Sequence, residues 1–493
     1  MSSLIIPFPT ELRPRLPTIV GNVDYLTLRQ RLEQIDELLQ TGGVEKDFVE
    51  QALQDWLPQG SHPPTARQQA KFQLRSRRAL RCNILRTLLQ EDYRGFSCAL
   101  AGNPLYQWFC CIDALDQVRV PSKSELQRYA YWLEKPQQMR SLNNGLLQAG
   151  LHQPQALQLE KPLDLEDYFL DTTCLKANIH FPVDWVLLRD ATRTLMKAVK
   201  LIREQGLKAR MEPPEEFLRR INRLSIAMTH SRRKTDCQKE RKRILRQMKK
   251  LVKVVGRHAR RHREVLDQQW SQTDWTRKQA EQVLRRIDQV LALLPQAQKQ
   301  AHERIIGERP VANAGKILSL YETDVRVVVR GKAGAEVEFG NTLLLGENRQ
   351  GIILDYQVWQ EPAPADVHLL VESLERVVVE LDWKVSGVGA DRGFASQANS
   401  AGLAEAEIFN GICPKSPQEL KKRMKEKRFV RMQKRRSQTE ARISIVQRGF
   451  LGRPLRAKGF AHRELSVAWG VLTHNLWMLA RLKKKPDKLL QAA

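Results

Sequence analysis

The sequence lacks the features of a membrane or secreted protein. No apolar run approaches the roughly 18 residues of a spanning helix, and prolines interrupt the N-terminal MSSLIIPFPTELRPRLP where a signal peptide needs an apolar stretch. Cysteine is scarce, with seven in 493 residues and no C-x-x-C pair, which argues against a zinc site or a disulfide framework. We therefore expect a cytoplasmic or nucleoid protein with no membrane association.

Acidic residues are also few. The chain has 55 Asp and Glu against 82 Lys and Arg, a net charge of +27, and the stretch from Arg232 to Arg263 holds 15 basic residues and two acids. Such an excess favours a polyanionic partner, most commonly nucleic acid, with an anionic membrane surface as the competing interpretation. Apolar residues make up 42% of the chain, which is typical of a globular protein, and the length fits roughly three domains.

Residues 1 to about 160 have helical apolar periodicity, as in YLTLRQRLEQIDELL and LYQWFCCIDALDQV. Ser122 and Glu125 form a capping-box pattern that predicts a new helix soon after the preceding one, as in a helix-turn-helix. Its first exposed residues would contact phosphates or base edges of DNA, and they are Lys123, Ser124, Gln127 and Arg128. Any two capped helices share this pattern, so an ordinary helix pair is the alternative.

Two acids follow predicted strands. Asp391 ends the apolar run WKVSGVGAD, and Asp171 follows the strand formers Tyr168 to Leu170. Open α/β sheets place their chemistry at the carboxyl ends of strands, so both acids are candidate site residues. Each is also explained by an ordinary turn or helix cap.

The segments between these acids predict a mixed sheet that is interrupted once. Residues 206 to 308 are helical and very basic, which favours two long helices packed as a hairpin that contacts a DNA backbone. A period of two then appears in VRVVV, VEFGNTLLL and GIILDYQVW, and it predicts strands that include a hairpin. Helices and short strands alternate from there to the C-terminal region.

A third acid, Glu440, lies in a basic helical stretch four residues after Arg436 and two before Arg442. A helical ion pair with Arg436 is the simple explanation. Phosphodiester cleavage or joining, however, uses divalent metals held by a few carboxylates. Two acids at adjacent strand ends and one on a helix across the sheet would form such a site.

Several segments occur in an order and spacing that resemble a known family. They are FLDTTCLKANIHFPVDW, GADRGFAS, RRSQTEARIS to RGFLGRP, and the terminal WGVLTHNLWMLAR. They resemble the DDE transposases of bacterial insertion sequences, which carry a ribonuclease H-like catalytic domain. The segments RRALRCNILR and PSKSELQRY also look like that family, so the resemblance covers about residues 70 to 482.

The resemblance implies that Asp171, Asp391 and Glu440 are catalytic metal ligands for Mg²⁺, with Mn²⁺ as a substitute. It implies DNA contacts around Glu440 from Arg436, Arg442 and Arg448. Gln433 stands where the family usually has tyrosine and Gln447 where it usually has lysine, with Arg448 adjacent. These departures leave the three carboxylates intact and affect the detailed DNA contacts.

The resemblance also implies the reaction and its partners. The protein would cut DNA at the terminal inverted repeats of its element and transfer the freed 3′-hydroxyl to target DNA, without a covalent enzyme intermediate. It would act as a homodimer in a synaptic complex in the bacterial cytoplasm, associated with the nucleoid. Two alternatives remain open: a DNA-binding protein without catalysis, and a metal-dependent nuclease on the same fold.

The expected fold is an α/β ribonuclease H-like core, a mixed sheet flanked by helices, with an all-helical N-terminal domain and a long helical insertion. The expected boundaries are 1–160 for the DNA-binding domain, 161–205 and 311–482 for the catalytic domain, 206–310 for the coiled-coil-like insertion, and 483–493 for a basic tail.

Overall fold

The computed structural model describes most of the chain, in two compact units. The described residues are 16–57, 64–114, 117–231, 236–332 and 335–482, so the predicted tail at 483–493 lies outside them. The first unit comprises residues 1–175, 342–359 and 363–493, and the second comprises 176–341 and 360–362. Within the described ranges, no helix combines the length and apolarity needed to cross a membrane.

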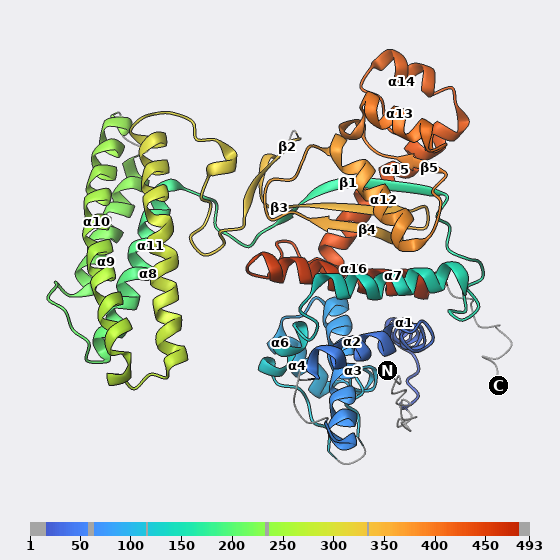
Figure 1. Cartoon of the computed structure of the whole chain (residues 1–493), viewed down its shortest axis with the longest axis horizontal. Helices are drawn as coiled ribbons and strands as arrows, with labels where there is room; N and C mark the ends of the chain where they lie inside the picture. The colour runs from blue at the N-terminus through green and yellow to red at the C-terminus, as the bar shows by residue number, and fades with distance from the viewer. Residues whose placement is uncertain (1–15, 58–63, 115–116, 232–235, 333–334, 483–493) are drawn as a thin grey trace. The chain divides into compact units, whose positions relative to one another are not determined.

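The N-terminal part of the first unit is helical, as predicted from its periodicity (Figure 1). Its helices are α1 Val23–Thr41, α2 Val44–Trp56, α3 Ala66–Leu89, α4 Tyr93–Gly102, α5 Pro104–Phe109, α6 Lys123–Ala130 and α7 Pro136–His152. Ser122 and Glu125 form the predicted capping box at the start of α6.

The helix that precedes α6 is shorter than its sequence predicts. The apolar run LYQWFCCIDALDQV indicates a helix to about residue 118, but α5 ends at Phe109. Cys111 has a left-handed backbone conformation (φ 53°), which an α-helix cannot continue through. Thirteen residues, 110 to 122, therefore separate α5 from α6, whereas a helix-turn-helix has a turn of about three or four residues. The expectation of such a motif here was wrong.

The sheet is mixed, with both parallel and antiparallel pairs, as expected. Its strands are β1 Asp167–Lys176, β2 Arg326–Lys332, β3 Ala335–Asn348, β4 Ile353–Val358, β5 Gly387–Gly389 and β6 Phe409–Asn410. The order is β2-β3-β1-β5-β6, with β4 also paired to β3. β2, β3 and β4 form antiparallel pairs, whereas β1, β5 and β6 run parallel to one another.

A buried polar network fixes β1 against its neighbours in the first unit. The Tyr168 hydroxyl hydrogen-bonds to Ser373 (2.6 Å), which donates to Asp355 on β4 (2.6 Å). Burial alone would raise the pKa of Asp355, but hydrogen bonds and charge from Arg376 and Arg140 hold it below its usual value. A Cβ at Gly346 would lie 1.7 Å from the Tyr168 oxygen, so β3 needs glycine there.

Helices of the C-terminal half flank this sheet. They are α12 Leu369–Leu381, α13 Gln397–Glu405, α14 Pro417–Arg423, α15 Lys427–Val446 and α16 Phe460–Leu482, with the 3₁₀ turns η4 Asp366–His368 and η5 Arg392–Phe394 and the π-helical turn η6 Gln447–Leu451. Asn475 on α16 both accepts from and donates to the backbone of Ile353, at 2.9 and 2.7 Å. The terminal HNLW segment thus joins α16 to β4.

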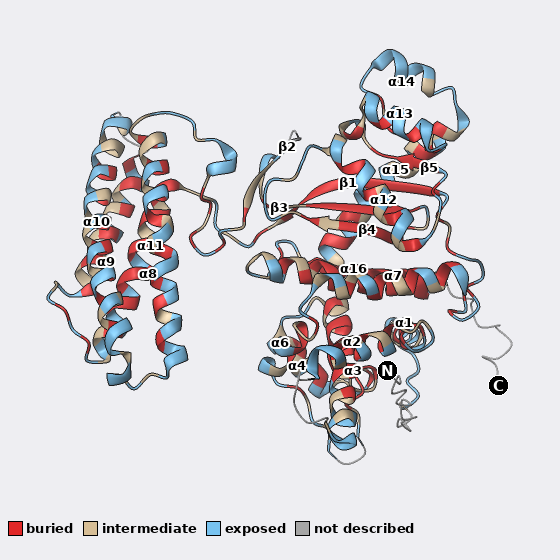
Figure 2. Cartoon of the chain, viewed as in Figure 1, coloured by how far each residue is buried: buried red, intermediate tan, exposed pale blue. Residues whose placement is uncertain are grey.

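The second unit is built around four long helices, and Figure 2 shows their buried residues facing one another. The helices are α8 Asp184–Glu204, α9 Pro214–His230, α10 Cys237–Gln269 and α11 Arg277–Ile305. The expected hairpin of two long helices is present as α10 and α11. The helical part begins earlier than the expected residue 206, because the apolar face of α8 packs in one core with α9, α10 and α11.

Candidate active site at the carboxyl edge of β1 and β5

The parallel pairing of β1 and β5 brings the first two predicted acids together. Asp167 pairs with Gly387, Tyr168 with Val388 and Phe169 with Gly389. The printed pairs end two residues before Asp171 on β1 and two residues before Asp391, so both acids follow paired residues of neighbouring parallel strands. Both residues are half-buried.

The position of Asp171 within its strand differs from expectation. The sequence predicts that Asp171 ends the strand, but β1 continues to Lys176. Threonines at 172 and 173 are good strand formers, so the chain stays extended after the acid. The Asp171 carboxylate accepts a hydrogen bond from the backbone N–H of Thr172 (2.8 Å).

Asp391 follows the carboxyl end of β5, as predicted. Its carboxylate accepts from the backbone N–H of Gly393 (2.8 Å) and caps η5. The capping interpretation is therefore correct, and it leaves the second carboxylate oxygen available for another partner. Capping and a site role are compatible in this residue.

A further acid, Asp366 at the start of η4, lies in the same place. Its carboxylate accepts from the Thr172 hydroxyl (3.1 Å). A Cβ built on Gly393 would lie 2.8 Å from Asp366 Oδ2 and 2.9 Å from Asp391 Oδ1, so these two oxygens are at most about twice that distance apart. Sequence reasoning missed Asp366, whose one signal is its position in PAPAD just before a helix.

Glu440 lies on α15, which two glutamines anchor to β1 and to the segments that follow β5 and β6. Gln433 donates to the carbonyl oxygens of Gly411 (2.6 Å) and Ala390 (3.4 Å), the residue before Asp391. Gln447 donates to Thr173 Oγ1 (3.0 Å) and to the Cys174 carbonyl (3.1 Å) on β1. Seven residues make almost two helical turns, so Glu440 lies midway between these anchors on the same helical face.

The two departures from the family pattern are therefore structural contacts in this chain. Both amides bind main-chain or hydroxyl groups beside the candidate site, which fixes how α15 crosses the sheet. The Glu440 side chain is 59% exposed, and its nearest cation is Arg436, with N and O 3.9 Å apart. The ion-pair explanation for Glu440 thus corresponds to a long, exposed contact, which contributes little stability.

Arg435 and Arg442 hold the other side of α15. Arg435 pairs with the buried Glu347 (3.0 Å) and donates to the Asn348 carbonyl (2.9 Å). Arg442 Nε lies 3.5 Å from the same carboxylate, and burial lowers the pKa of Arg442. Arg442 points into the protein, whereas Arg448 on η6 is exposed. Of the three arginines predicted around Glu440, Arg448 and the half-buried Arg436 are placed to reach a ligand.

The carboxylates of Asp171, Asp391 and Asp366 are of the donor type that a hard divalent cation such as Mg²⁺ prefers. The available donors are carboxylate oxygens, and Gly393 leaves a space between two of them that a Cβ would fill. Within the described part of the chain, however, no three His, Cys, Asp or Glu side chains lie close enough together to hold a metal ion. The residues fit the ion chemically, and Glu440, the third carboxylate predicted, is on α15.

The predicted DNA-contacting residues of α6 lie on its surface. Lys123, Ser124, Gln127 and Arg128 are all exposed. The last three line a groove of about 900 Å³ together with Tyr93 on α4, Tyr131 directly after α6 and His462 on α16. Tyr131 and His462 pack with ring centroids 4.5 Å apart. This groove offers both hydrogen-bond donors and flat apolar surfaces.

Comparison of the chain with models of protein families, with curated proteins and with solved structures gave no match. The fold defines a mixed α/β protein with a helical insertion in its sheet, and Asp171, Asp366 and Asp391 lie on or beside the parallel strands β1 and β5.

Proposed function

We propose that this protein is a DDE-type transposase that cuts DNA at the ends of its element and joins the 3′ ends to target DNA. One observation supports the proposal: β1 and β5 pair in parallel up to Phe169 and Gly389, two residues before Asp171 and Asp391, the two acids selected from sequence alone. The helix that bears Glu440 is anchored by Gln433 to the Ala390 carbonyl after β5 and by Gln447 to Thr173 on β1. A mixed sheet with two acids at neighbouring strands and a third on a crossing helix agrees with a ribonuclease H-like core.

Each part of the proposed mechanism has residues of this chain to perform it. Asp171, Asp391 and Glu440 would hold Mg²⁺, which supplies positive charge for the phosphate oxygens of the reacting strand. Arg436 and Arg448 would position the phosphodiester through charge-assisted hydrogen bonds. The capping bond from Gly393 and the Thr172 N–H fix the orientation of the two aspartates before substrate binds.

The test is cleavage and strand transfer with Mg²⁺ or Mn²⁺, on DNA that carries the terminal inverted repeats flanking the coding region. We expect Asp171→Asn, Asp391→Asn and Glu440→Gln to lose activity, because each removes one carboxylate charge without changing side-chain shape. Glu405→Gln, at an exposed position on α13, is the matched control and should retain activity. Full activity in the Asp391 or Glu440 variant would contradict the proposal. Cutting without joining would indicate a nuclease.

A DNA-binding protein without catalysis is the second candidate, and one observation favours it. In the described ranges no group of three potential ligands is close enough for a metal ion. Titration of Mn²⁺ by calorimetry separates the two functions. A transposase should bind the ion and lose binding in Asp171→Asn, whereas a non-catalytic binder needs no metal at all.

A further inference from the structure

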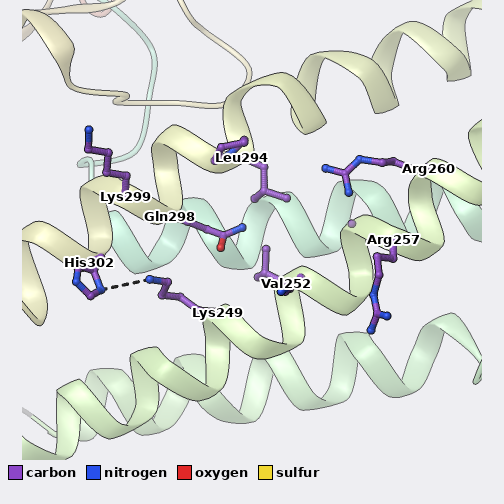
Figure 3. Close-up of a pocket in the computed structure, with 11 residues that line it drawn as sticks. Lys249, Val252, Arg257, Arg260, Leu294, Gln298, Lys299 and His302 are labelled. Carbon is purple, nitrogen blue, oxygen red and sulfur yellow. Dashed lines mark hydrogen bonds between the residues drawn. The ribbon is translucent and has the colours of Figure 1, made fainter.

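A basic groove runs between α10 and α11 of the helical unit (Figure 3). Its volume is about 630 Å³. Val252 and Leu294 lie in its wall, and Lys249 donates a hydrogen bond to Nδ1 of His302 (3.2 Å). Among the described residues no carboxylate lines the groove, and its basic side chains are Lys249, Lys253, Arg257, Arg260, Lys299 and His302.

Gly256 helps to keep the groove open. It lies on α10 within the groove lining, and a Cβ there would have ordinary contacts, with Leu294 at 3.8 Å and Arg260 at 3.9 Å. Glycine inside a helix costs about 1 kcal/mol relative to alanine. The backbone does not need glycine here, so larger side chains at this position would extend into the groove.

Some cations of the helical unit have acidic partners, whereas three cations of the groove have none among the described residues. Arg263 pairs with Asp288 (3.0 Å) and Arg277 with Glu281 (3.0 Å) on the same two helices. By contrast, Lys253, Arg257 and Lys299 have no acidic partner within 4 Å in the part of the chain that the structure describes, and all three are exposed. Unpaired like charges gathered in one groove repel each other until an anion binds.

The spacing of the cations favours a polymer of phosphates. Lys249, Lys253 and Arg257 follow one another at four-residue intervals on one face of α10, a step of about 6 Å along the helix axis. That step is close to the distance between consecutive phosphates of a nucleic acid strand. A small anion would engage one or two of these cations and leave the others unneutralised.

The groove is built to contact phosphates and not bases. Proteins that hold single strands stack bases on aromatic side chains. No Phe, Tyr or Trp is present among the groove residues in the described ranges. Contacts to phosphates alone position a duplex without reading its sequence.

We infer that the α10–α11 groove is a sequence-independent binding site for the phosphate backbone of duplex DNA. The inference rests on the proposed function for the identity of the polyanion, and it assigns to the helical insertion a DNA-holding role separate from the carboxylate site. Non-specific, salt-sensitive binding is what such a site would contribute to a protein that must engage target DNA of many sequences.

The experiment uses the full chain and a random-sequence duplex in EDTA, so that cleavage plays no part. Binding is followed by fluorescence anisotropy over a range of salt concentrations. The groove variant Lys253→Gln/Arg257→Gln/Lys299→Gln is compared with Lys200→Gln/Arg219→Gln/Arg277→Gln, which removes the same charge from ion-paired positions of the same unit. We expect the groove variant to bind the duplex at least about tenfold more weakly than the unaltered protein. The slope of its log binding constant against log salt concentration should be smaller in magnitude by about 2 to 3. Both quantities should change much less in the control variant.

A second pair of variants removes no cation. Gly256→Glu places a carboxylate in the groove, whereas Gly256→Gln places a neutral side chain of the same size there. We expect Gly256→Glu to weaken duplex binding several-fold more than Gly256→Gln. Equal binding within both comparisons would overturn the inference, and so would tighter groove-dependent binding of a single strand or of anionic vesicles than of the duplex.

The outcomes separate this inference from the proposed function. If the protein cuts element ends but its groove and control variants bind random duplex equally well, the proposed function stands and the groove inference fails. If duplex binding depends on the groove but the protein cuts no DNA, the groove inference stands and the proposed function fails.

Discussion

The Thr172 hydroxyl donates a hydrogen bond to the Asp366 carboxylate over 3.1 Å. This bond ties the residue after Asp171 on β1 to the first turn of η4, in a place where Asp391 also lies close by. Asp366 is therefore a further carboxylate near Asp391, in addition to the two acids predicted on neighbouring strands. Whether Asp366 shares in holding a cation can be measured directly.

Asp366→Asn removes one negative charge and keeps an oxygen that can accept from Thr172, so the fold should be preserved. We expect the dissociation constant for Mn²⁺ to rise about tenfold, because fewer charged oxygens face the ion. Calorimetric titration measures it. Asp382→Asn, at the exposed left-handed C-cap of α12 where asparagine is well tolerated, is the control and should bind Mn²⁺ as the unaltered protein does. Unchanged affinity in the Asp366 variant would exclude it from the site.

Gly393→Ala should damage the site by contact alone. The added Cβ would come within 3 Å of one oxygen from each of Asp366 and Asp391, and these short side chains would have to move apart. We expect weaker Mn²⁺ binding and slower DNA cleavage with little loss of stability. Gly402→Ala on α13 meets nothing within 4 Å, so it should leave both activities unchanged and stabilise the helix by about 1 kcal/mol. Equal metal binding in the two variants would show that the space beside Gly393 has no role.

Glu347 should be a positioning residue for α15. Its buried carboxylate pairs with Arg435 and faces Arg442, so Glu347→Gln would leave two guanidinium groups without their counter-charge. We expect the free energy of unfolding to fall by about 3 kcal/mol. Urea denaturation gives this value, and Glu33→Gln, which breaks an exposed helical pair with Arg29, should cost only a few tenths of a kcal/mol.

If Glu347 also positions Glu440, the same variant should show a second effect. Under conditions where it remains folded, its cleavage rate should fall while random-duplex binding stays constant. Loss of stability with an unchanged cleavage rate would limit Glu347 to a purely structural role.

The positions of Asp171 and Asp391 in the candidate site could be predicted because each follows residues with clear strand preference. Glu440 could be placed on a helix, since its surroundings have helical periodicity. Asp366 could not, because PAPAD contains no strand pattern and its relation to Asp391 depends on the long-range path of the chain. The predicted strand end at Asp171 was wrong for a local reason: residues 172 to 175 continue the strand preference.

The boundary of the helical insertion shows a different limit of sequence reasoning. The amphipathic pattern of α8 predicts a helix correctly, but periodicity does not say which neighbour the apolar face will contact. Its buried residues pack with those of α9 to α11 and not with the sheet. Likewise, Gln433 and Gln447 differ from the resembled family at two positions, and their contacts with β1 and with the carbonyls of Ala390 and Gly411 emerge only from the folded chain.

His474 should make stability depend on pH. It is fully buried on α16 against the ring of Phe450, and burial lowers its pKa to about 4. In the unfolded chain its pKa is about 6.5, so between pH 6.5 and 4 the unfolded state binds more protons than the folded state. The free energy of unfolding must therefore fall as the pH falls through this range, by about 2 kcal/mol from this residue between pH 7 and 5.

His474→Gln tests this dependence, because the glutamine cannot ionise. Urea denaturation at a series of pH values should show a smaller loss of stability between pH 7 and 5 in the variant than in the unaltered protein. Other groups, including the buried His262, titrate in both proteins and cancel in the comparison. Above pH 7 His474 is neutral in both the folded and the unfolded protein. The stability curves of the variant and of the unaltered protein should therefore run parallel there. Curves that stay parallel down to pH 5 would show that His474 gains its proton in the folded protein as readily as in the unfolded chain.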